Sequence, residues 1–142
     1  MPGPKWAAPA PSRSIRDGTT AGVRGRYTLA VRFTPKDAII PAEKLRDYVL
    51  SPSHPDGRAK AAYLARLGYS QEAWPRLEAD LRQQILTREA EPAKSSPYGQ
   101  KYEILGPLMG PNGATAWVRA IWIVLTGEQE PRLVTLVPEE RP

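Results

Sequence analysis

The chain has no cysteine among its 142 residues, and it has a single histidine, His54. The absence of cysteine excludes a disulfide framework, a thiol nucleophile and a thiolate metal site. One histidine cannot supply a two-histidine relay or a histidine-rich metal centre. Because no cluster of carboxylates indicates a Mg²⁺ site either, we expect the protein to use no metal and no other cofactor.

Long hydrophobic runs are also missing. A membrane-spanning helix needs about 18 or more consecutive apolar residues, and no such run occurs. The N-terminus lacks the apolar core of a secretory signal peptide. These absences favour a protein without a membrane span that acts in a cytoplasm.

The net charge of +5 is unevenly distributed. Residues 1–36 hold seven Lys/Arg and one Asp, whereas residues 37–142 hold 13 basic and 14 acidic residues. The N-terminal part can therefore dock on nucleic acid, on an acidic protein or on a larger assembly, or it can be a solvated arm. The nearly neutral remainder argues against a large phosphate-binding face, although it leaves room for a small basic cleft.

Proline content divides the chain into a tail and a domain. Four of the 16 prolines lie within the first 11 residues, so we expect residues 1–24 to be a disordered or extended tail. Residues 25–142 are expected to form a single α+β domain. Its first segment has apolar residues at alternate positions from Tyr27 to Phe33, which predicts a half-buried strand over 25–33.

Three helices are predicted in the middle of the chain. Pro41 is typical of a helix start, and the second helix is expected over about 55–67, where Gly68 ends it. The third helix begins between residues 70 and 75 and runs to about 88, with Asp80 on its solvent face. Residues 89–97 are interpreted as a linker.

The last third of the chain has the pattern of a β-meander. Strands are predicted over 98–105, 114–126 and 132–137, with a Gly-Pro-Asn-Gly turn at 110–113 and a central position for the second strand. Helices followed by strands with short turns indicate an α+β fold. Two or three helices should pack on one face of this C-terminal antiparallel sheet, which the 25–33 strand can join.

Several polar residues are candidates for chemistry. His54 can act as a general acid or base, or it can simply cap the helix that follows Pro55. Lys60, one turn into that helix, either joins His54 in a basic patch or lies on an ordinary solvated face. Tyr98 and Tyr102 are either catalytic or part of the sheet, and Lys101 beside them is a candidate phosphate ligand.

Arg119 is a charge within a strand that is otherwise built for burial. Such a charge must be paired or functional. We therefore regard Arg119 either as a phosphate ligand or as a surface residue opposite Glu103 or Arg132. Arg132 is a further candidate for binding phosphate.

Six segments of the chain form a joint pattern. They are Ile39-Ile40-Pro41-x-x-Lys44-Leu45-x-x-Tyr48-x-Leu50-Ser51-Pro52-x-His54-Pro55-x-Gly57-x-x-Lys60-Ala61, Gly68-Tyr69, Tyr98-Gly99-x-Lys101-Tyr102, Gly110-Pro111-Asn112-Gly113, Trp122-Ile123 and Pro131-Arg132-Leu133-Val134-Thr135. Over residues 38–138 the pattern resembles an uncharacterised bacterial domain family, which occurs at the C-termini of polymorphic and contact-dependent toxins and as small stand-alone proteins.

The resemblance implies a toxin-like module, delivered into the cytoplasm of a target cell, with a cognate immunity or antitoxin protein as partner. Its layout is similar to the barnase, EndoU, colicin and RelE group of metal-independent ribonucleases. If the domain cleaves RNA, the motif positions that the resemblance implies are His54, Lys60, Tyr98, Lys101, Tyr102 and Arg132.

Two main functions remain open. A metal-independent ribonuclease needs an acid, a base and cations around the phosphate, so its residues should converge in one cleft on the open sheet face. A non-enzymatic binding or assembly module predicts that these residues scatter, and that the basic arm of residues 1–36 and an edge strand form the contact surface. A small-molecule enzyme would need a deep apolar pocket.

Overall fold

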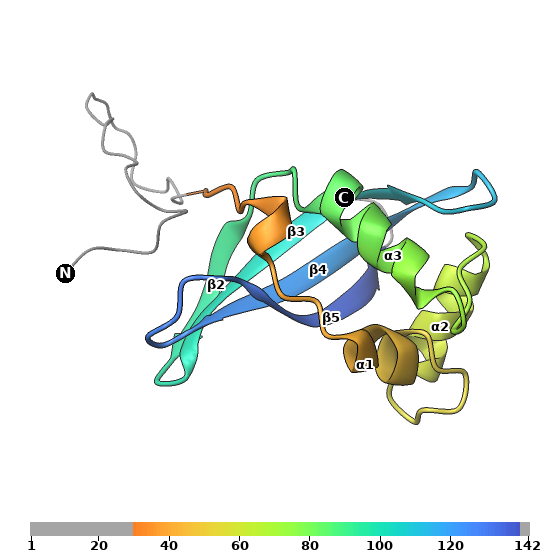
Figure 1. The fold of residues 1–142 in the computed structure, drawn as a ribbon, viewed down its shortest axis with the longest axis horizontal. Helices are drawn as coiled ribbons and strands as arrows, with labels where there is room; N and C mark the ends of the chain where they lie inside the picture. Colours follow the sequence, from red (N-terminus) through yellow and green to blue (C-terminus); the bar gives the residue numbers. More distant parts are fainter. Residues whose placement is uncertain (1–29, 140–142) are drawn as a thin grey trace.

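The computed structural model describes residues 30–139 and shows helices packed against an antiparallel sheet (Figure 1). The four strands are β2 (Glu91–Ser96), β3 (Gly99–Met109), β4 (Thr115–Leu125) and β5 (Arg132–Glu139). They lie in the order β2-β3-β4-β5, and each is antiparallel to its neighbour. The predicted α+β class is therefore confirmed, as is the interior position of β4.

The helical elements precede the sheet in the chain. They are η4 (Pro35–Asp37), α1 (Ala42–Lys44) with its π-helical continuation η5 (Leu45–Val49), α2 (Arg58–Ala65), and α3 (Trp74–Asp80) with its π-helical continuation η6 (Leu81–Ile85). The three predicted helices are therefore present. The second is shorter than expected, because residues 55–57 form a turn in which the His54 carbonyl accepts from the N–H groups of Gly57 and Arg58.

The prediction of a linker over 89–97 is wrong, because the strand β2 occupies most of this segment. All six residues of β2 are exposed, and Glu91 to Ser96 pair with β3 across a register shift between Pro92 and Ser95. An edge strand with both faces in water needs no alternation of apolar residues. The turn at Pro97 and Tyr98 brings β2 beside β3, so that Ser96 pairs with Gly99. The pattern of residue types alone does not reveal this pairing.

The predicted strand over 25–33 lies largely outside the described residues. Within the described part, Val31 forms an isolated antiparallel bridge with Ala90, and Phe33 is buried against the rings of Tyr102 and Trp122. The fourth strand of the sheet is thus β2.

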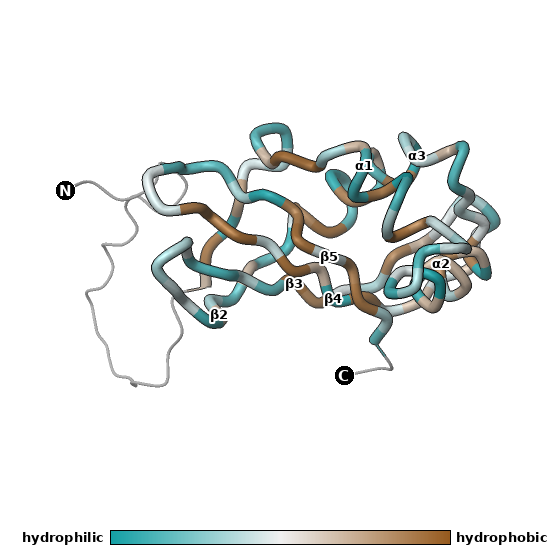
Figure 2. Tube along the Cα trace, turned by 90° about the horizontal axis from the view of Figure 1, so that it is seen from below, coloured by the Kyte–Doolittle hydropathy of each residue, from teal (hydrophilic) through white to brown (hydrophobic). Residues whose placement is uncertain are grey.

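The core lies between the helices and one face of the sheet. Trp122 of β4 is fully buried there, together with Leu77, Leu81 and Ile85 from the third helix. Figure 2 shows α1 and α3 on the same side of the sheet. Successive residues of a strand point to opposite sides of the sheet, so Trp117, Arg119, Ile121 and Ile123 of β4 point away from the helices. We call this side of the sheet the open face.

The β3–β4 turn docks on the chain segment that follows α2. Asn112 donates its backbone N–H to the Leu67 carbonyl at 3.2 Å and its side-chain amide to the Arg66 carbonyl at 3.1 Å. A Cβ atom on Gly110 would overlap the Leu67 carbonyl oxygen. Gly68 has a φ of 99° and lies against Asn112, so the two glycine-containing motifs fit each other.

Tyr69 extends this contact into the third helix. Its hydroxyl donates to Asp80 Oδ2 at 2.6 Å, and Arg76 Nε donates to the same oxygen at 3.0 Å. Burial and the neighbouring carboxylate raise the pKa of the Tyr69 hydroxyl, so the phenol remains a donor. Asp80 was expected on the solvent face, but it is buried, because this hydrogen-bonded pair satisfies it.

We expect Gly110→Ala to lower the free energy of unfolding by about 3 kcal/mol, since the added methyl group collides with backbone that cannot move aside cheaply. Gly113→Ala in the same turn is the matched control. Gly113 has a positive φ but open space around it, so its substitution should cost about 1 kcal/mol. Urea denaturation measures both, and equal losses would contradict the docking role of Gly110.

Candidate functional site

Four polar residues of the long motif meet around one aromatic ring. The His54 ring lies edge-on to the Tyr48 ring, with 4.9 Å between their centroids. The ammonium groups of Lys60 and Lys44 lie 5.5 and 5.7 Å from the centroid of the same ring. All four side chains are half-buried. We call this group the Tyr48 cluster.

Three elements position the Tyr48 cluster. Lys44 and Tyr48 come from α1 and η5, His54 from the loop between η5 and α2, and Lys60 from α2. Gly57 allows the loop to pass close to Tyr48, because a Cβ atom there would overlap the Tyr48 carbonyl oxygen. The glycine of the motif is thus explained by the close approach that brings His54 and Lys60 to the ring.

One ring nitrogen of His54 is already engaged. The backbone N–H of Asp56 donates to Nδ1 at 3.0 Å. Nδ1 therefore acts as an acceptor, and the proton of the neutral imidazole is on Nε2. In this tautomer Nε2 is a donor, which suits an acid or an anion-binding group.

The Tyr48 cluster has an excess of positive charge. Neither Lys44 nor Lys60 forms an ion pair with any residue between 30 and 139, and His54 adds a further N–H donor. Aromatic faces attract ammonium groups but do not neutralise them. The arrangement can therefore hold an anion such as a phosphate.

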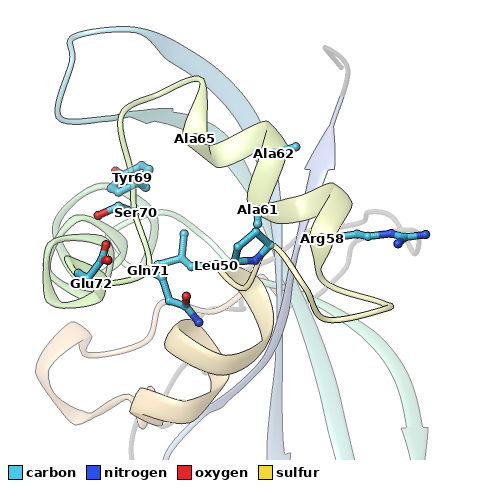
Figure 3. Close-up of a pocket in the computed structure, with 10 residues that line it drawn as sticks. Leu50, Arg58, Ala61, Ala62, Ala65, Tyr69, Ser70, Gln71 and Glu72 are labelled. Atoms are coloured by element: carbon cyan, nitrogen blue, oxygen red, sulfur yellow. The ribbon is translucent and has the colours of Figure 1, made fainter.

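A groove of about 450 Å³ lies on another side of α2 (Figure 3). Ala61, Ala62 and Ala65 line it on the helix, and Leu50 and Tyr69 line it from the neighbouring segments. None of the residues that line it belongs to the Tyr48 cluster. Ala62 follows Lys60 by two positions, which places it about 200° around the helix, so α2 separates the groove from the cluster.

The two predicted tyrosines lie elsewhere. Tyr98 is 77% exposed at the turn between β2 and β3. Tyr102 packs on the core side of β3, where its ring meets Phe33 edge-on at 5.3 Å. Burial raises the pKa of Tyr102, so its hydroxyl keeps its proton.

Lys101 and Arg132 lie in one row across the open face, since each is near Ile123 in the strand register. Arg132 is 3.5 Å from Glu128 in an ion pair. The β2–β3 turn and the β4–β5 turn, which are close to this row, lie at the end of the sheet away from α2 (Figure 1). The structure thus brings His54 and Lys60 together and leaves Lys101 and Arg132 in a separate place.

Arg119 is paired within the open face. Its Nε and Nη2 donate to the two carboxylate oxygens of Glu139 at 3.1 and 3.0 Å, and its Nη1 donates to Glu103 Oε1 at 2.7 Å. These bonds hold the pKa of Glu139 below the value of a free glutamate. Three of the five N–H donors of Arg119 are thus occupied by carboxylates.

The prediction of candidate site residues missed Lys44 and Tyr48. Both stand in the motif, and their i, i+4 spacing places them on one face of a helix. That spacing could have identified Lys44 and Tyr48 as neighbours on a helix surface. Only the loop geometry shows that His54 and Lys60 approach the same surface.

Two further kinds of feature are absent from residues 30–139. No group of three or more His, Asp or Glu residues lies close enough together to hold a metal ion. None of the helices there is long and apolar enough to cross a membrane.

The fold and the Tyr48 cluster define a small α+β domain that carries a basic, histidine-containing surface site. The chain belongs to the family described as Domain of unknown function (DUF6883), which matches residues 34–140. The resemblance to an uncharacterised domain family is thereby confirmed, over a range slightly longer than expected. No curated protein sequence matches the chain.

A solved structure has a similar fold. It is a chain of the "Contact-dependent growth inhibition toxin - immunity protein complex from Klebsiella pneumoniae 342", with a TM-score of 0.55 and 16% sequence identity. The match covers 76% of this chain and 98% of that chain. At this identity the likeness shows the fold alone.

The pairing of Glu139 predicts a pH dependence of stability. Because the folded-state pKa of Glu139 is lowered, the unfolded chain binds more protons in acid. The contribution of Glu139 is present above the unfolded pKa of about 4.3 and is lost as the pH falls through the folded-state pKa.

Urea midpoints from pH 7 to pH 2.5 test this for the wild type and for Glu139→Gln. The difference between the two should be largest near neutral pH and should shrink below about pH 4. A difference that stays constant over this range would contradict the ion pair with Arg119.

Proposed function

We propose that the chain is a toxin-type module that cleaves RNA without a metal ion, and that the Tyr48 cluster is its active site. The observation that carries the proposal is the convergence of the single histidine and two unpaired lysines on one tyrosine ring. Family membership and a fold shared with a chain of a toxin–immunity complex support a toxin-like role.

The reaction that suits this site is attack by a ribose 2′-oxygen on the adjacent phosphorus. The new P–O bond gives a 2′,3′-cyclic phosphate, and the bond to the 5′-oxygen breaks. Lys44 and Lys60 neutralise the charge that grows on the phosphoryl oxygens. His54 as the imidazolium gives its Nε2 proton to the leaving 5′-oxygen, and in that form Nδ1 is protonated and no longer accepts from Asp56.

The proton of the 2′-hydroxyl goes either to Lys60 in its neutral amine form or to Tyr48 in its phenolate form. With Lys60 as the base, Lys44 alone neutralises the charge on the phosphoryl oxygens. Tyr48→Phe and Lys60→Ala separate these roles. The residue that acts as base is the one whose loss removes the acidic limb of the pH–rate profile, where the rate rises with pH as the base loses its proton.

The proposal includes a partner. A domain that cleaves RNA in a target cell has to be neutralised in the cell that makes it, and the similar fold belongs to a chain of a toxin–immunity protein complex. A cognate immunity protein for this chain is therefore part of the proposal, as is delivery into the cytoplasm of a target cell.

A second function is a non-enzymatic binding or assembly module. It is favoured by the separation of Lys101, Arg119 and Arg132 from the Tyr48 cluster, since a single cleft would have brought all of them together. The edge strand that this function was expected to use, over 25–33, lies largely outside the described residues. The edge strand β2 is itself a poor template for a further strand, because Pro92, Lys94 and a register shift interrupt it.

Purified protein is incubated with total cellular RNA, with and without EDTA. We expect cleavage that survives EDTA and falls at least about a hundredfold in His54→Ala and in Lys60→Ala. Lys44→Ala should lose about tenfold, since it removes one of two cations. Lys36→Ala, an exposed lysine outside the cluster, is the control and should keep full activity.

Unfolding midpoints establish that each variant is folded before its activity is compared. Cleavage that EDTA abolishes, or that His54→Ala leaves intact, would overturn the assignment of the site. Absence of cleavage by folded wild-type protein would favour the binding module. Lys101→Ala tests whether the open face also contacts the RNA.

A further inference from the structure

The open face of the sheet is unusually apolar for a surface. The half-buried apolar side chains on it are Leu105, Trp117, Ile121, Ile123 and Val137. An antiparallel sheet that has water on one side usually presents polar residues there. Contiguous apolar patches of this kind mark places where another protein docks.

The edges of the sheet are poorly suited to a further strand. Pro92 and a register shift interrupt β2. Beyond the end of β2, the Gln84 side chain occupies both backbone groups of Met109, since it donates to the carbonyl at 3.0 Å and accepts from the N–H at 2.8 Å. On the other edge, Ile39 bridges to Arg132 at the start of β5. Association through the open face is therefore favoured over strand addition.

The charges on the open face balance. The strands contribute three cations and three anions to it, namely Lys101, Arg119, Arg132, Glu91, Glu103 and Glu139. A nucleic acid selects a surface with an excess of Lys and Arg, so a neutral face does not suit it. This face suits a partner that also carries both signs, and a second copy of the same face is such a partner.

Two of these charges lie on opposite sides of the centre of the apolar patch. Lys101 on β3 is the register partner of Ile123, and Glu139 on β5 is the register partner of Trp117. The strand between β3 and β5 is β4, and its position 120 is equally far from 123 and 117. The midpoint between Lys101 and Glu139 therefore lies on β4 beside Ile121, in the middle of the patch.

A two-fold axis gives Lys101 a partner. Within residues 30–139 no ion pair is formed by Lys101. An axis that passes over the midpoint, at right angles to the line from Lys101 to Glu139, exchanges these two positions between copies. Both carboxylate oxygens of Glu139 accept from Arg119, and each has a second lone pair for an ammonium group.

The open face is large enough for a specific dimer. Neighbouring strands lie about 4.8 Å apart and a strand rises about 3.3 Å per residue, so four strands of about eight residues cover roughly 500 Å². Two such faces bury about 1,000 Å² in total, which is the low end of specific interfaces and suits a reversible dimer.

We propose that two copies of the chain associate through their open faces. The sheets stack about 10 Å apart with the helices outermost, and Ile121 lies close to the two-fold axis. Lys101 of each copy pairs with Glu139 of the other. The inference does not depend on the ribonuclease proposal, because the Tyr48 cluster belongs to the helical part of the chain.

Sedimentation velocity of the full chain over a range of concentrations tests the association. We expect a dimer whose fraction rises with concentration. Ile121→Lys should raise the dissociation constant at least about thirtyfold, because each copy then brings an ammonium group into an apolar interface. In the free chain this group lies opposite Glu103, which favours the folded state. Ala62→Lys adds the same charge at an exposed position in the groove beside α2 and, as the matched control, should leave the dissociation constant unchanged.

A carbodiimide cross-link tests the pairing in the wild type, so this measurement does not depend on the folding of a variant. The reagent joins an amine to a carboxylate that it contacts. Within one chain, Lys101 and Glu139 are about 20 Å apart, because their register partners are six residues apart along β4. A Lys101–Glu139 cross-link therefore joins two chains. We expect it in the wild type, between labelled and unlabelled copies in an isotope mixture, and not in Ile121→Lys.

Three results would contradict this model. A monomer at every concentration would overturn the proposal. A dimer that Ile121→Lys leaves intact and Ala62→Lys disrupts would overturn it too, since association would then use the groove beside α2. A dimer without a Lys101–Glu139 cross-link would overturn the two-fold arrangement.

Discussion

The contact between the segment after α2 and the β3–β4 turn organises the rest of the structure. Asn112 binds the carbonyls of Leu67 and Arg66, and glycines on both sides let the two backbones touch. Tyr69 then ties this junction to Asp80 in the third helix. Because α2 is held at its C-terminal end, its N-terminal turns, which carry Lys60, have a fixed direction relative to η5.

The family motif therefore divides into a packing part and an exposed part. Gly68, Tyr69, Gly110 and Asn112 are explained by the junction alone, and Trp122 by the core. Lys44, His54 and Lys60 make no such contribution, since they are half-exposed around the ring of Tyr48, which itself packs against the core. Polar residues that packing does not require are where binding or chemistry is expected.

The two faces of the sheet differ in how their side chains are covered and paired. On the core face the side chains pack against the helices and against Phe33, and Trp122 is fully buried. On the open face the apolar side chains surround Arg119, whose charge is satisfied by Glu103 and Glu139 from neighbouring strands. A charge in the middle of an apolar surface needs such partners, and the register of three strands supplies them.

Periodicity in the sequence determined the three helices and the strands β3, β4 and β5, because burial imposes a period that residue types record. It did not reveal β2, whose two exposed faces leave no such record. It also placed Asp80 on the surface, since the partner that satisfies this acid, Tyr69, is eleven residues away. Tertiary structure alone decided that His54 and Lys60 meet at Tyr48 while Lys101 and Arg132 lie apart, because such distances depend on how elements dock and not on their local pattern.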